Sequence, residues 1–354
     1  MATESPAKKL KLDGPKIGTH SGHFHADEAL AVSMLRILPS YAESPLIRTR
    51  DPEELATCHT VVDVGAEYVP DRNRYDHHQR EFNTTFPGHF TKLSSAGLVY
   101  MHFGKDIIRT ITGLPEGQDL NVLYEKIYTD FIEAFDANDN GVNVVAPQDL
   151  EKAGIAKKFE DRGFSIASVV NRYNYSISST EALTKEQKQA EEDAKFSRAS
   201  TFVGEQFRLE LTDRANSWLP ARNAVAHAYN NRFQYDNRGR ILVLPDGMPW
   251  ADHLYSLEKE SSIPQGVDPQ VLYVLFPEDK DDVKGRTRIR AVSKENGGFL
   301  NRKDLPDSWK GMRDEQLDQI TGVPGGVFIH AAGFIGGHKT FDGALALAQK
   351  ALES

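Results

Sequence analysis

From Lys16 onward, short apolar runs typical of strands alternate with longer runs whose apolar residues recur at helical spacing. This alternation predicts an α/β fold with a parallel sheet, because parallel strands need a crossover connection, usually a helix, between them. In such sheets ligands collect beyond the carboxyl ends of the strands. The elements expected in the first part of the chain are strands over 16–19, 46–48 and 61–64, and helices over 27–38, 52–56, 94–112 and 120–139.

The chain has 354 residues, enough for about two domains of ordinary size. We expect a tail over 1–15, an N-terminal parallel-sheet domain over 16–145, a helical connector over 146–230 with a long helix from 185 to 214, and a smaller C-terminal α/β domain over 231–354. The elements expected in that last domain are strands over 241–244, 271–276, 286–292 and 327–330, and helices over 250–259, 313–319 and 342–352.

Three features of the composition exclude classes of function. The single cysteine, Cys58, rules out an intramolecular disulfide and thiolate zinc clusters, so a metal would have to be bound by histidines and carboxylates. A net charge of −9 argues against a chain-wide basic surface of the kind that binds duplex nucleic acid. No apolar run approaches the roughly 20 residues of a membrane helix, so we expect no membrane partner.

The N-terminal tail contains a basic cluster. Three lysines, Lys8, Lys9 and Lys11, fall within four positions. The cluster resembles a short nuclear-import signal, and a disordered, solvated tail explains it equally well. The first interpretation predicts a protein of the nucleus and cytoplasm.

Histidines and aspartates gather in three segments, each beside a predicted strand. Seven of the twelve histidines precede residue 90. Such groups are costly to bury unless a cation takes up their lone pairs and charge, so the pattern predicts a metal site at one edge of the sheet. The candidate ligands are His20, His25 and Asp27 in the first segment, Asp63 in the second, and Asp76, His77 and His78 in the third.

The residues alone leave some roles open. Asp63 lies inside an apolar strand, where it either bridges two metals or hydrogen-bonds loop amides. Asp27, taken without the later segments, would cap a helix beside exposed histidines. A last carboxylate is offered by Asp136 or Asp139, which lie three residues apart and share a helical face.

The order of these residues resembles the motifs of the DHH phosphoesterase superfamily: His-x4-His-x-Asp, an aspartate in a buried strand, Asp-His-His and a final aspartate. The resemblance is stronger still to one branch, the melanocyte-proliferating-gene family of RNA exonucleases, and covers nearly the whole chain from residue 16. It implies a DHH-type domain followed by a substrate-binding domain. Many superfamily members have aspartate where this chain has His25. The similar segments are 19–30, 61–65, 75–79, 94–100, 139–141 and 333–338.

The resemblance implies a site for two divalent metal ions, Mn²⁺ or Mg²⁺. Two cations about 4 Å apart would activate a water and clamp the phosphoryl oxygens. Asp63 would bridge them, His78 would contact the scissile phosphate or orient a metal-bound group, and Asp76 would support a histidine. The expected ligands are His20, His25 and Asp63 for one ion, and Asp27, Asp63, His77 and Asp136, or Asp139 in its place, for the other.

The second half of the chain offers candidate substrate contacts. Arg286, Arg288 and Arg290 alternate along a predicted strand and would share one face, where they could hold a phosphate backbone or protect an edge strand. The run Gly336-Gly337-His338, followed by Lys339, is expected between a strand and a helix, where small residues let amides approach an anion. It resembles the glycine-rich substrate motif of the superfamily, and the resemblance adds Ser94, Ser95 and His330 to the substrate-binding residues.

The ligand set predicts a two-metal phosphodiesterase. The resemblance implies more, namely a 3′-to-5′ exoribonuclease that releases nucleoside monophosphates from single-stranded RNA, with the mitochondrion as a further compartment. Two alternatives remain. One is a phosphatase for pyrophosphate or short oligonucleotides, and the other is a scaffold protein whose closed metal site is structural.

Overall fold

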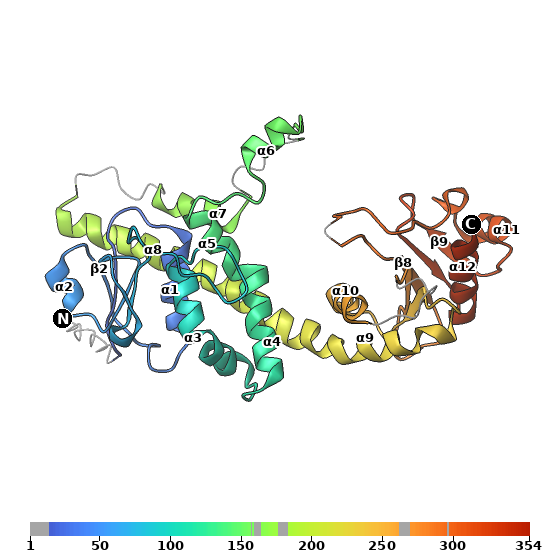
Figure 1. Ribbon diagram of the computed structural model, residues 1–354, viewed down its shortest axis with the longest axis horizontal. Coiled ribbons are helices and arrows are strands. Elements are labelled where there is room, and N and C mark those ends of the chain that lie inside the picture. The colour runs from blue at the N-terminus through green and yellow to red at the C-terminus, as the bar shows by residue number, and fades with distance from the viewer. Residues whose placement is uncertain (1–13, 157, 159–163, 176–182, 262–269, 296) are drawn as a thin grey trace, which may run out of the picture. The chain divides into compact units, whose positions relative to one another are not determined.

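The computed structural model describes residues 14–156, 158, 164–175, 183–261, 270–295 and 297–354 (Figure 1). The lysine cluster at 8–11 lies outside the described residues. The chain forms two compact units, Met1–Ala215 and Asn216–Ser354. The predicted α/β class is confirmed, since each unit combines one sheet with helices.

The first unit contains a five-stranded sheet with the strand order β2-β1-β3-β5-β4. Its strands are β1 (Ile17–Thr19), β2 (Leu46–Arg48), β3 (Thr60–Val62), β4 (Tyr68–Val69) and β5 (Arg74–Tyr75). All neighbours run parallel except β4, which joins β5 as an antiparallel edge strand. The sequence did not predict β4 and β5, because a strand of 2 residues is too short to show a period.

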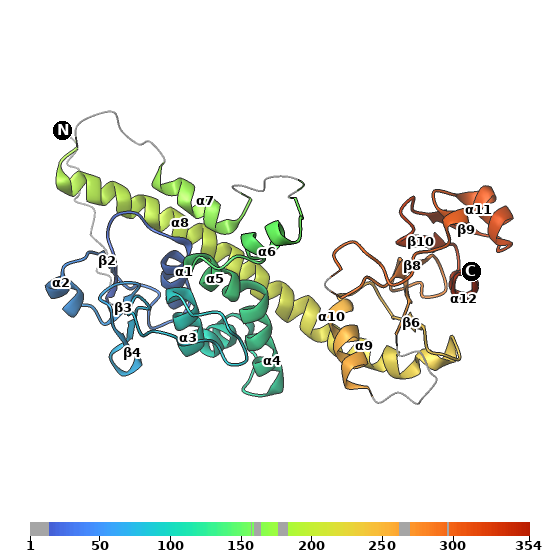
Figure 2. The same ribbon diagram turned by 45° about the horizontal axis from the view of Figure 1, so that its top comes forward.

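The helices of the first unit are α1 (Ala26–Leu35), α2 (Pro52–Ala56), α3 (Ser95–Thr112), α4 (Gln118–Ile127), α5 (Glu133–Asp139), α6 (Pro147–Lys152), α7 (Ile166–Asn174) and α8 (Lys185–Asp213). A 3₁₀ turn spans Pro70–Arg72, and a π-helix, Tyr128–Ile132, joins α4 to α5. Because α3 and α8 both pack against it, α1 is buried on nearly all sides. Helices α7 and α8 lie alongside each other (Figure 2).

The long helix α8 belongs to the first unit and not to a separate connector. Its Phe196 ring lies 5.4 Å from that of Phe24, between centroids, and Ser200 Oγ donates to the backbone oxygen of Ala29 at 2.7 Å. The observed boundary at 215 therefore differs from the predicted boundary at 145 and connector over 146–230. The sequence of α8 is rich in charged side chains, and its few buried residues are spread along the helix. Such a pattern is typical of a linker helix, which explains why the predicted connector includes α8.

The second unit contains a five-stranded sheet with the order β6-β7-β8-β10-β9. Only β6 and β7 pair in parallel, and the other neighbours are antiparallel. Helix α12 packs against β7, β8 and β10. Among the helices that the structure describes, none has the length and apolarity to cross a membrane. The elements are β6 (Ile241–Val243), β7 (Tyr273–Pro277), β8 (Thr287–Ala291), β9 (Gly326–Ile329), β10 (Ile335–His338), α9 (Leu219–Asn231), α10 (Ala251–Glu260), α11 (Asp314–Thr321) and α12 (Phe341–Glu353), with a π-helix at Arg214–Trp218 and 3₁₀ turns at Arg232–Gln234 and Asp307–Trp309.

Candidate metal centre

The predicted ligands meet at the carboxyl ends of three neighbouring parallel strands. His20 follows β1, Asp63 follows β3, and Asp76 and His77 follow β5. Helix α1 adds His25 and Asp27 at its first turn, since His25 is its N-cap residue. The sheet therefore brings together residues that are more than fifty positions apart, as expected for the carboxyl edge of a parallel α/β sheet.

Asp63 lies between two imidazoles. Its Oδ2 is 3.3 Å from His20 Nε2, and its Oδ1 is 3.3 Å from His77 Nε2. The backbone of Asp63 is left-handed, with φ 59°, a conformation uncommon for residues other than glycine. The side chain is buried, so the fold holds this carboxylate at a fixed place with one oxygen towards each histidine.

Glu28 is a site residue that the sequence reasoning did not select. It is fully buried on α1, and its Oε1 lies 3.0 Å from His20 Nε2. The same carboxylate accepts the backbone N–H of His25 at 2.8 and 3.0 Å, one distance to each oxygen. A glutamate three positions after an N-cap residue is the pattern of a capping box, and this signal in the sequence could have identified it.

Of the two aspartates left open for the last position, the structure places Asp139 at the site. Asp139 Oδ2 lies 3.1 Å from His77 Nε2. Asp136 is fully buried elsewhere: its Oδ1 accepts the Ser94 N–H at 2.8 Å and the Ser94 hydroxyl at 2.7 Å. Burial raises the pKa of Asp136 to about 7 in spite of these hydrogen bonds. Asp136 and Asp139 lie three residues apart in the same helix, α5, and both follow the π-helix, so their spacing did not indicate which of them reaches the site.

Ser94 and Ser95 support carboxylates and are not exposed to a substrate. Ser95 donates to Asp27 Oδ2 from its hydroxyl at 2.7 Å and from its backbone N–H at 3.3 Å. Both serines are fully buried. The expectation that they contact substrate is therefore corrected, because their hydroxyl groups already serve Asp27 and Asp136 at the start of α3.

Asp76 supports a histidine, as predicted, and that histidine is His78. Asp76 Oδ1 lies 2.6 Å from His78 Nδ1, and Asp76 Oδ2 accepts the Ala66 N–H at 2.6 Å. Burial would raise the pKa of Asp76, but these hydrogen bonds lower it. The bond to Asp76 raises the pKa of His78. His78 is more than half exposed, and its Nε2 is left for a ligand outside the protein.

The ionisable groups of the centre perturb one another strongly. Burial alone would lower the pKa of His20, but hydrogen bonds to Asp63 and Glu28 raise it to about 10. Burial would also lower the pKa of His77, but Asp139 and Asp63 raise it to about 9. Burial would also raise the pKa of Asp63, yet the two imidazoles hold it at about 2. A metal would therefore have to displace protons from both histidines at neutral pH.

The residues present fit a cation. Asp27 Oδ1 and His77 Nδ1 are buried with no hydrogen-bond partner among the described residues, and Asp63 Oδ1 has only the ion-pair contacts to His77 and His78. Burial and the charges of Asp63 and Asp139 raise the pKa of Asp27 well above its usual range, so the site is short of positive charge. Mixed oxygen and imidazole ligands suit Mn²⁺ or Mg²⁺. Three groups of described residues have ligand atoms within 4.8 Å of one another: His20, His25, Glu28 and Asp63; Asp63, His77 and His78; and His25, Asp27 and Asp139.

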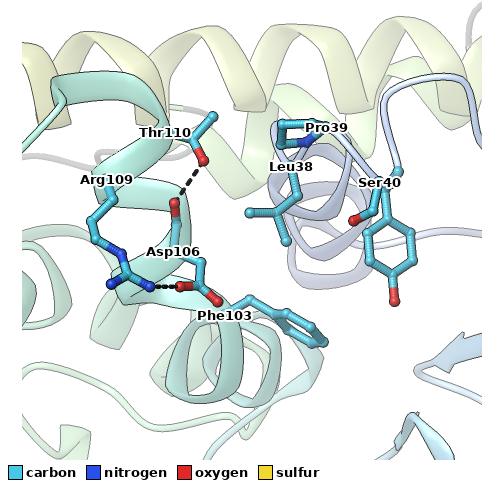
Figure 3. Close-up of a pocket in the computed structure, with 8 residues that line it drawn as sticks. Leu38, Pro39, Ser40, Phe103, Asp106, Arg109 and Thr110 are labelled. Carbon is cyan, nitrogen blue, oxygen red and sulfur yellow. Dashed lines mark hydrogen bonds and ion pairs between the residues drawn. The ribbon is translucent and has the colours of Figure 1, made fainter.

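A cavity of about 280 Å³ opens onto these groups. Its lining includes Arg50, an exposed residue after β2 that no motif in the sequence indicated. The other lining residues are His20, His25, Asp63, Val64, Gly65, Ala66, Asp76 and His78. A second hollow, of about 500 Å³ between the segment 38–41 after α1 and helix α3, is unrelated to this chemistry (Figure 3). Its charged residues Asp106 and Arg109 pair with each other.

In the second unit, the predicted arginine row is present. Arg288 and Arg290 lie half-buried on β8 and alternate with the buried Thr287, Ile289 and Ala291, while Arg286 is exposed just before the strand. The Arg288 guanidinium lies 4.9 Å from the centre of the Phe328 ring and pairs with Glu278 at 2.9 Å. The row is thus one face of a sheet with aromatic neighbours.

The glycine motif is a strand and not the expected loop. Gly336 and Gly337 lie within β10 and pair with both β8 and β9, so their backbone groups belong to the sheet ladders. The ring of His338 is buried, with Nδ1 accepting the Thr340 N–H at 3.0 Å and Nε2 donating to the Pro324 oxygen at 3.0 Å.

The sequence predicted that the amide groups of this motif would be free to bind an anion. This prediction is wrong for Gly336 and Gly337, because their backbone groups pair with neighbouring strands. Of the neighbouring candidates, Lys339 and His330 remain exposed. The sequence showed two adjacent glycines and no apolar alternation, which explains why β10 was not predicted.

Comparison with known proteins gives the family. Residues 16–352 match the family described as MYG1_exonuc, uncharacterised protein family UPF0160. The MYG1 exonuclease of Homo sapiens is 43% identical over 346 residues, which cover 96% of this chain and 86% of that protein. The MYG1 protein of Dictyostelium discoideum is 41% identical over 337 residues, which cover 95% of this chain and 96% of that protein.

Among solved structures, RecJ in complex with Mn²⁺ from Thermus thermophilus aligns with a TM-score of 0.24 at 14% identity, over 96% of this chain and 52% of RecJ. A likeness this low carries no argument about fold or chemistry. The family match and the identities to the curated relatives are decisive by themselves. The chain belongs to the MYG1_exonuc family.

Proposed function

We propose that this protein is a metal-dependent exoribonuclease that removes nucleoside monophosphates from the 3′ end of single-stranded RNA with two divalent cations. The observation that carries the proposal is Asp63, whose carboxylate faces His20 with one oxygen and His77 with the other. A carboxylate in this position is suited to bridge two cations. The relatives named exonucleases support a nuclease, while the preference for RNA and the 3′ end rest on the resemblance to the family.

We assign the residues to two ligand sets that share Asp63. His20, His25 and Glu28, whose ligand atoms lie within 4.8 Å of one another and of Asp63, would complete one set. His77 and Asp139, which are 3.1 Å apart, and Asp27, which groups with Asp139, would complete the other. Mn²⁺ or Mg²⁺ bound there would supply an activated water and neutralise charge on the phosphate. Within the protein, Asp76 holds His78 by Nδ1 and so orients Nε2 for a phosphate oxygen. Ser95 fixes Asp27 Oδ2 and leaves Oδ1 for the cation.

The arginine face of the second unit supports a nucleic-acid substrate. Arg313 also lies over the Phe328 ring, at 5.8 Å, and Arg290 lies 4.5 Å from the centre of the Phe334 ring. Rings interleaved with guanidinium groups suit single strands, because bases stack on the rings and phosphates pair with the cations. This face gathers Arg288, Arg290 and Arg313 in a protein whose net charge is −9, and of these Arg288 also pairs with Glu278.

The test is hydrolysis of end-labelled single-stranded RNA with Mn²⁺, comparing the parent protein with Asp63→Asn and His77→Ala. We expect both variants to lose at least about 100-fold in rate, since each removes a ligand. The exposed Asp71, on the 3₁₀ turn after β4, provides a matched control in Asp71→Asn. Undiminished hydrolysis in both site variants would reject the metal assignment.

The same assay separates the alternatives. Cleavage of pyrophosphate or dinucleotides without cleavage of longer RNA would identify a small-substrate phosphatase. Metal binding without hydrolysis of any of these substrates would identify a structural site. A label at the 5′ end should yield a ladder of shortened RNA if digestion proceeds from the 3′ end.

The compartment stays a prediction, with nucleus and cytoplasm expected from the lysine cluster and the mitochondrion from the resemblance. Microscopy of the full chain fused to a fluorescent protein would test it. Replacing Lys8, Lys9 and Lys11 by glutamine should abolish nuclear accumulation if the cluster is an import signal.

A further inference from the structure

Arg50 lies at the rim of the metal centre. It follows β2, the strand next to β1, and the Thr49 N–H donates to the Thr19 oxygen at 2.8 Å, so the pairing of the two strands continues up to this point. Arg50 therefore stands beside His20. Among the described residues that line the cavity of about 280 Å³, it is the only lysine or arginine.

A comparison with Arg48, two residues earlier, shows what is unusual about Arg50. Arg48 is buried, lies over the rings of Phe24 and Phe196 at 5.4 and 4.8 Å, and donates to the Gly22 oxygen at 2.7 Å. Arg50 is exposed and donates only to the Ser21 oxygen, at 3.3 Å, apart from a contact of its Nη2 with His20 Nδ1 at 3.2 Å. Within the described part of the chain, it pairs with no carboxylate. Arg48 is a structural residue, whereas the charge of Arg50 is available.

The contact with His20 is incompatible with metal ligation. Arg50 can donate to His20 Nδ1 only if that nitrogen carries a lone pair, whereas Nδ1 carries a proton both in the doubly protonated ring and in the neutral ring that binds a cation through Nε2. Nε2 is the atom that faces Glu28 and Asp63, and it must be unprotonated to bind a cation. In the metal-binding tautomer, Nδ1 carries the proton and donates to the Ser21 oxygen at 3.2 Å. Arg50 Nη2 then has no hydrogen-bond acceptor at His20, and its side chain lines the cavity.

We propose that Arg50 is a catalytic residue whose guanidinium binds the non-bridging oxygens of the scissile phosphate. The inference rests on the proposed hydrolysis of a phosphodiester. In that reaction, the water oxygen bonds to phosphorus, the P–O3′ bond breaks, and one proton of the water ends on the 3′ oxygen. Negative charge accumulates on the non-bridging oxygens as water attacks. A planar guanidinium with paired N–H donors stabilises this charge better than it stabilises the starting diester.

The test compares Arg50→Gln and Arg50→Lys with the control Arg72→Gln. Arg72 is an exposed arginine of the same unit whose only described partner among carboxylates is Glu67. Titration calorimetry measures Mn²⁺ binding without RNA, and then AMP binding to the Mn²⁺-loaded protein. For Arg50→Gln we expect Mn²⁺ affinity within about twofold of the parent, AMP affinity at least about tenfold weaker, and kcat on RNA about 100-fold lower with a smaller change in KM.

Arg50→Lys should fall between the parent and Arg50→Gln, because an ammonium group keeps the charge and loses the paired geometry. It also serves as the test variant if Arg50→Gln fails to fold. Unchanged AMP affinity would overturn the proposal. Loss of Mn²⁺ binding would also overturn it, since Arg50 would then act by holding His20. If the parent hydrolyses no RNA, the proposed function fails, and the AMP titrations still decide whether Arg50 binds a phosphate.

Discussion

At the scale of single residues, Asp63 shows most clearly how the fold serves the site. It is buried, lies between two imidazoles, and has a left-handed backbone that most residues avoid. Such strain costs on the order of 1–3 kcal/mol and persists only where the surroundings over-determine the conformation. Here the conformation turns the chain at the end of β3 while the carboxylate stays between His20 and His77.

Two substitutions of Asp63 separate the effect of its backbone strain from the effect of its charge. Asparagine tolerates the left-handed conformation better than alanine does. We therefore expect Asp63→Ala to lower the free energy of unfolding by about 1 kcal/mol more than Asp63→Asn, measured by urea denaturation in EDTA. Both variants should lose tight Mn²⁺ binding. Equal stability of the two variants would show that the backbone of Asp63 is not strained.

The histidines predict a pH dependence. The folded protein raises the pKa of His20 to about 10 and that of His77 to about 9, above the ~6.5 of an unfolded chain. A raised pKa of this kind contributes stability that is complete below pH ~6.5 and is lost as the pH rises through the folded values. Without metal, the free energy of unfolding should therefore fall between about pH 7 and 10.

Urea denaturation in EDTA across this range measures the effect, and His77→Gln should reduce the slope. Mn²⁺ affinity should rise over the same range, because fewer protons compete for the imidazoles. An unfolding free energy that does not change with pH would contradict the ion pairs described for His20 and His77.

At the scale of elements, the N-terminus of α3 is bound by two carboxylates from other helices. Asp136 accepts the N–H groups of Ser94 and Gly97 at 2.8 and 3.1 Å, and Asp27 accepts that of Ser95. Amide groups at a helix start favour anions, both as donors and through the helix dipole. One of these carboxylates fixes the fold, and the other keeps a free oxygen for the metal centre.

This division predicts opposite effects for two neighbouring aspartates. Asp136→Ala leaves buried N–H groups of α3 without partners and should cost at least about 2 kcal/mol in unfolding free energy. Its Mn²⁺ affinity should change little at temperatures where it is folded. Asp139→Ala should weaken Mn²⁺ binding about tenfold or more with little effect on stability. Calorimetry and urea denaturation measure both quantities, and the reverse pattern would return Asp136 to the metal site.

How far the sequence predicted the site depends on the element that carries each residue. His20, Asp63 and His77 follow strands, and the carboxyl edge of a parallel sheet gathers such residues whatever the details of packing. Asp139 could not be chosen over Asp136, because the two lie three residues apart in one helix, α5, and helical spacing places both on the same face. Arg50 contacts the site only through the pairing of β2 with β1, which no spacing in the sequence encodes.

At the scale of the whole molecule, the sequence predicted the α/β class and most elements but misplaced the boundary between the units. The boundary was lost because α8 buries few residues along its length, and these include Phe196, Val203 and Phe207. In the second unit, β10 was not predicted as a strand because two of its four residues are glycines, although it lies inside the sheet between β8 and β9. Both errors have the same cause. Contacts with the rest of the fold stabilise these segments, and their own composition does not indicate the structure that they adopt.

The observed boundary predicts which fragment folds. A fragment of residues 1–215 keeps α8 against α1 and should unfold cooperatively and bind Mn²⁺ as the full chain does. A fragment of residues 1–145 would expose the apolar surface of α1 and should aggregate or remain unfolded. Circular dichroism during heating and titration calorimetry test both fragments. Equal folding of the shorter fragment would show that α8 is dispensable.

The hydrogen bond from the Ala66 N–H to Asp76 Oδ2, at 2.6 Å, has a consequence for spectroscopy. A short bond from an amide to a carboxylate moves the amide proton resonance downfield and slows its exchange with solvent. Because Asp76 also holds His78, a ligand that engages the imidazole should change the resonance of Ala66 without touching it. The backbone amide of Ala66 is therefore a built-in nuclear magnetic resonance reporter for events at His78.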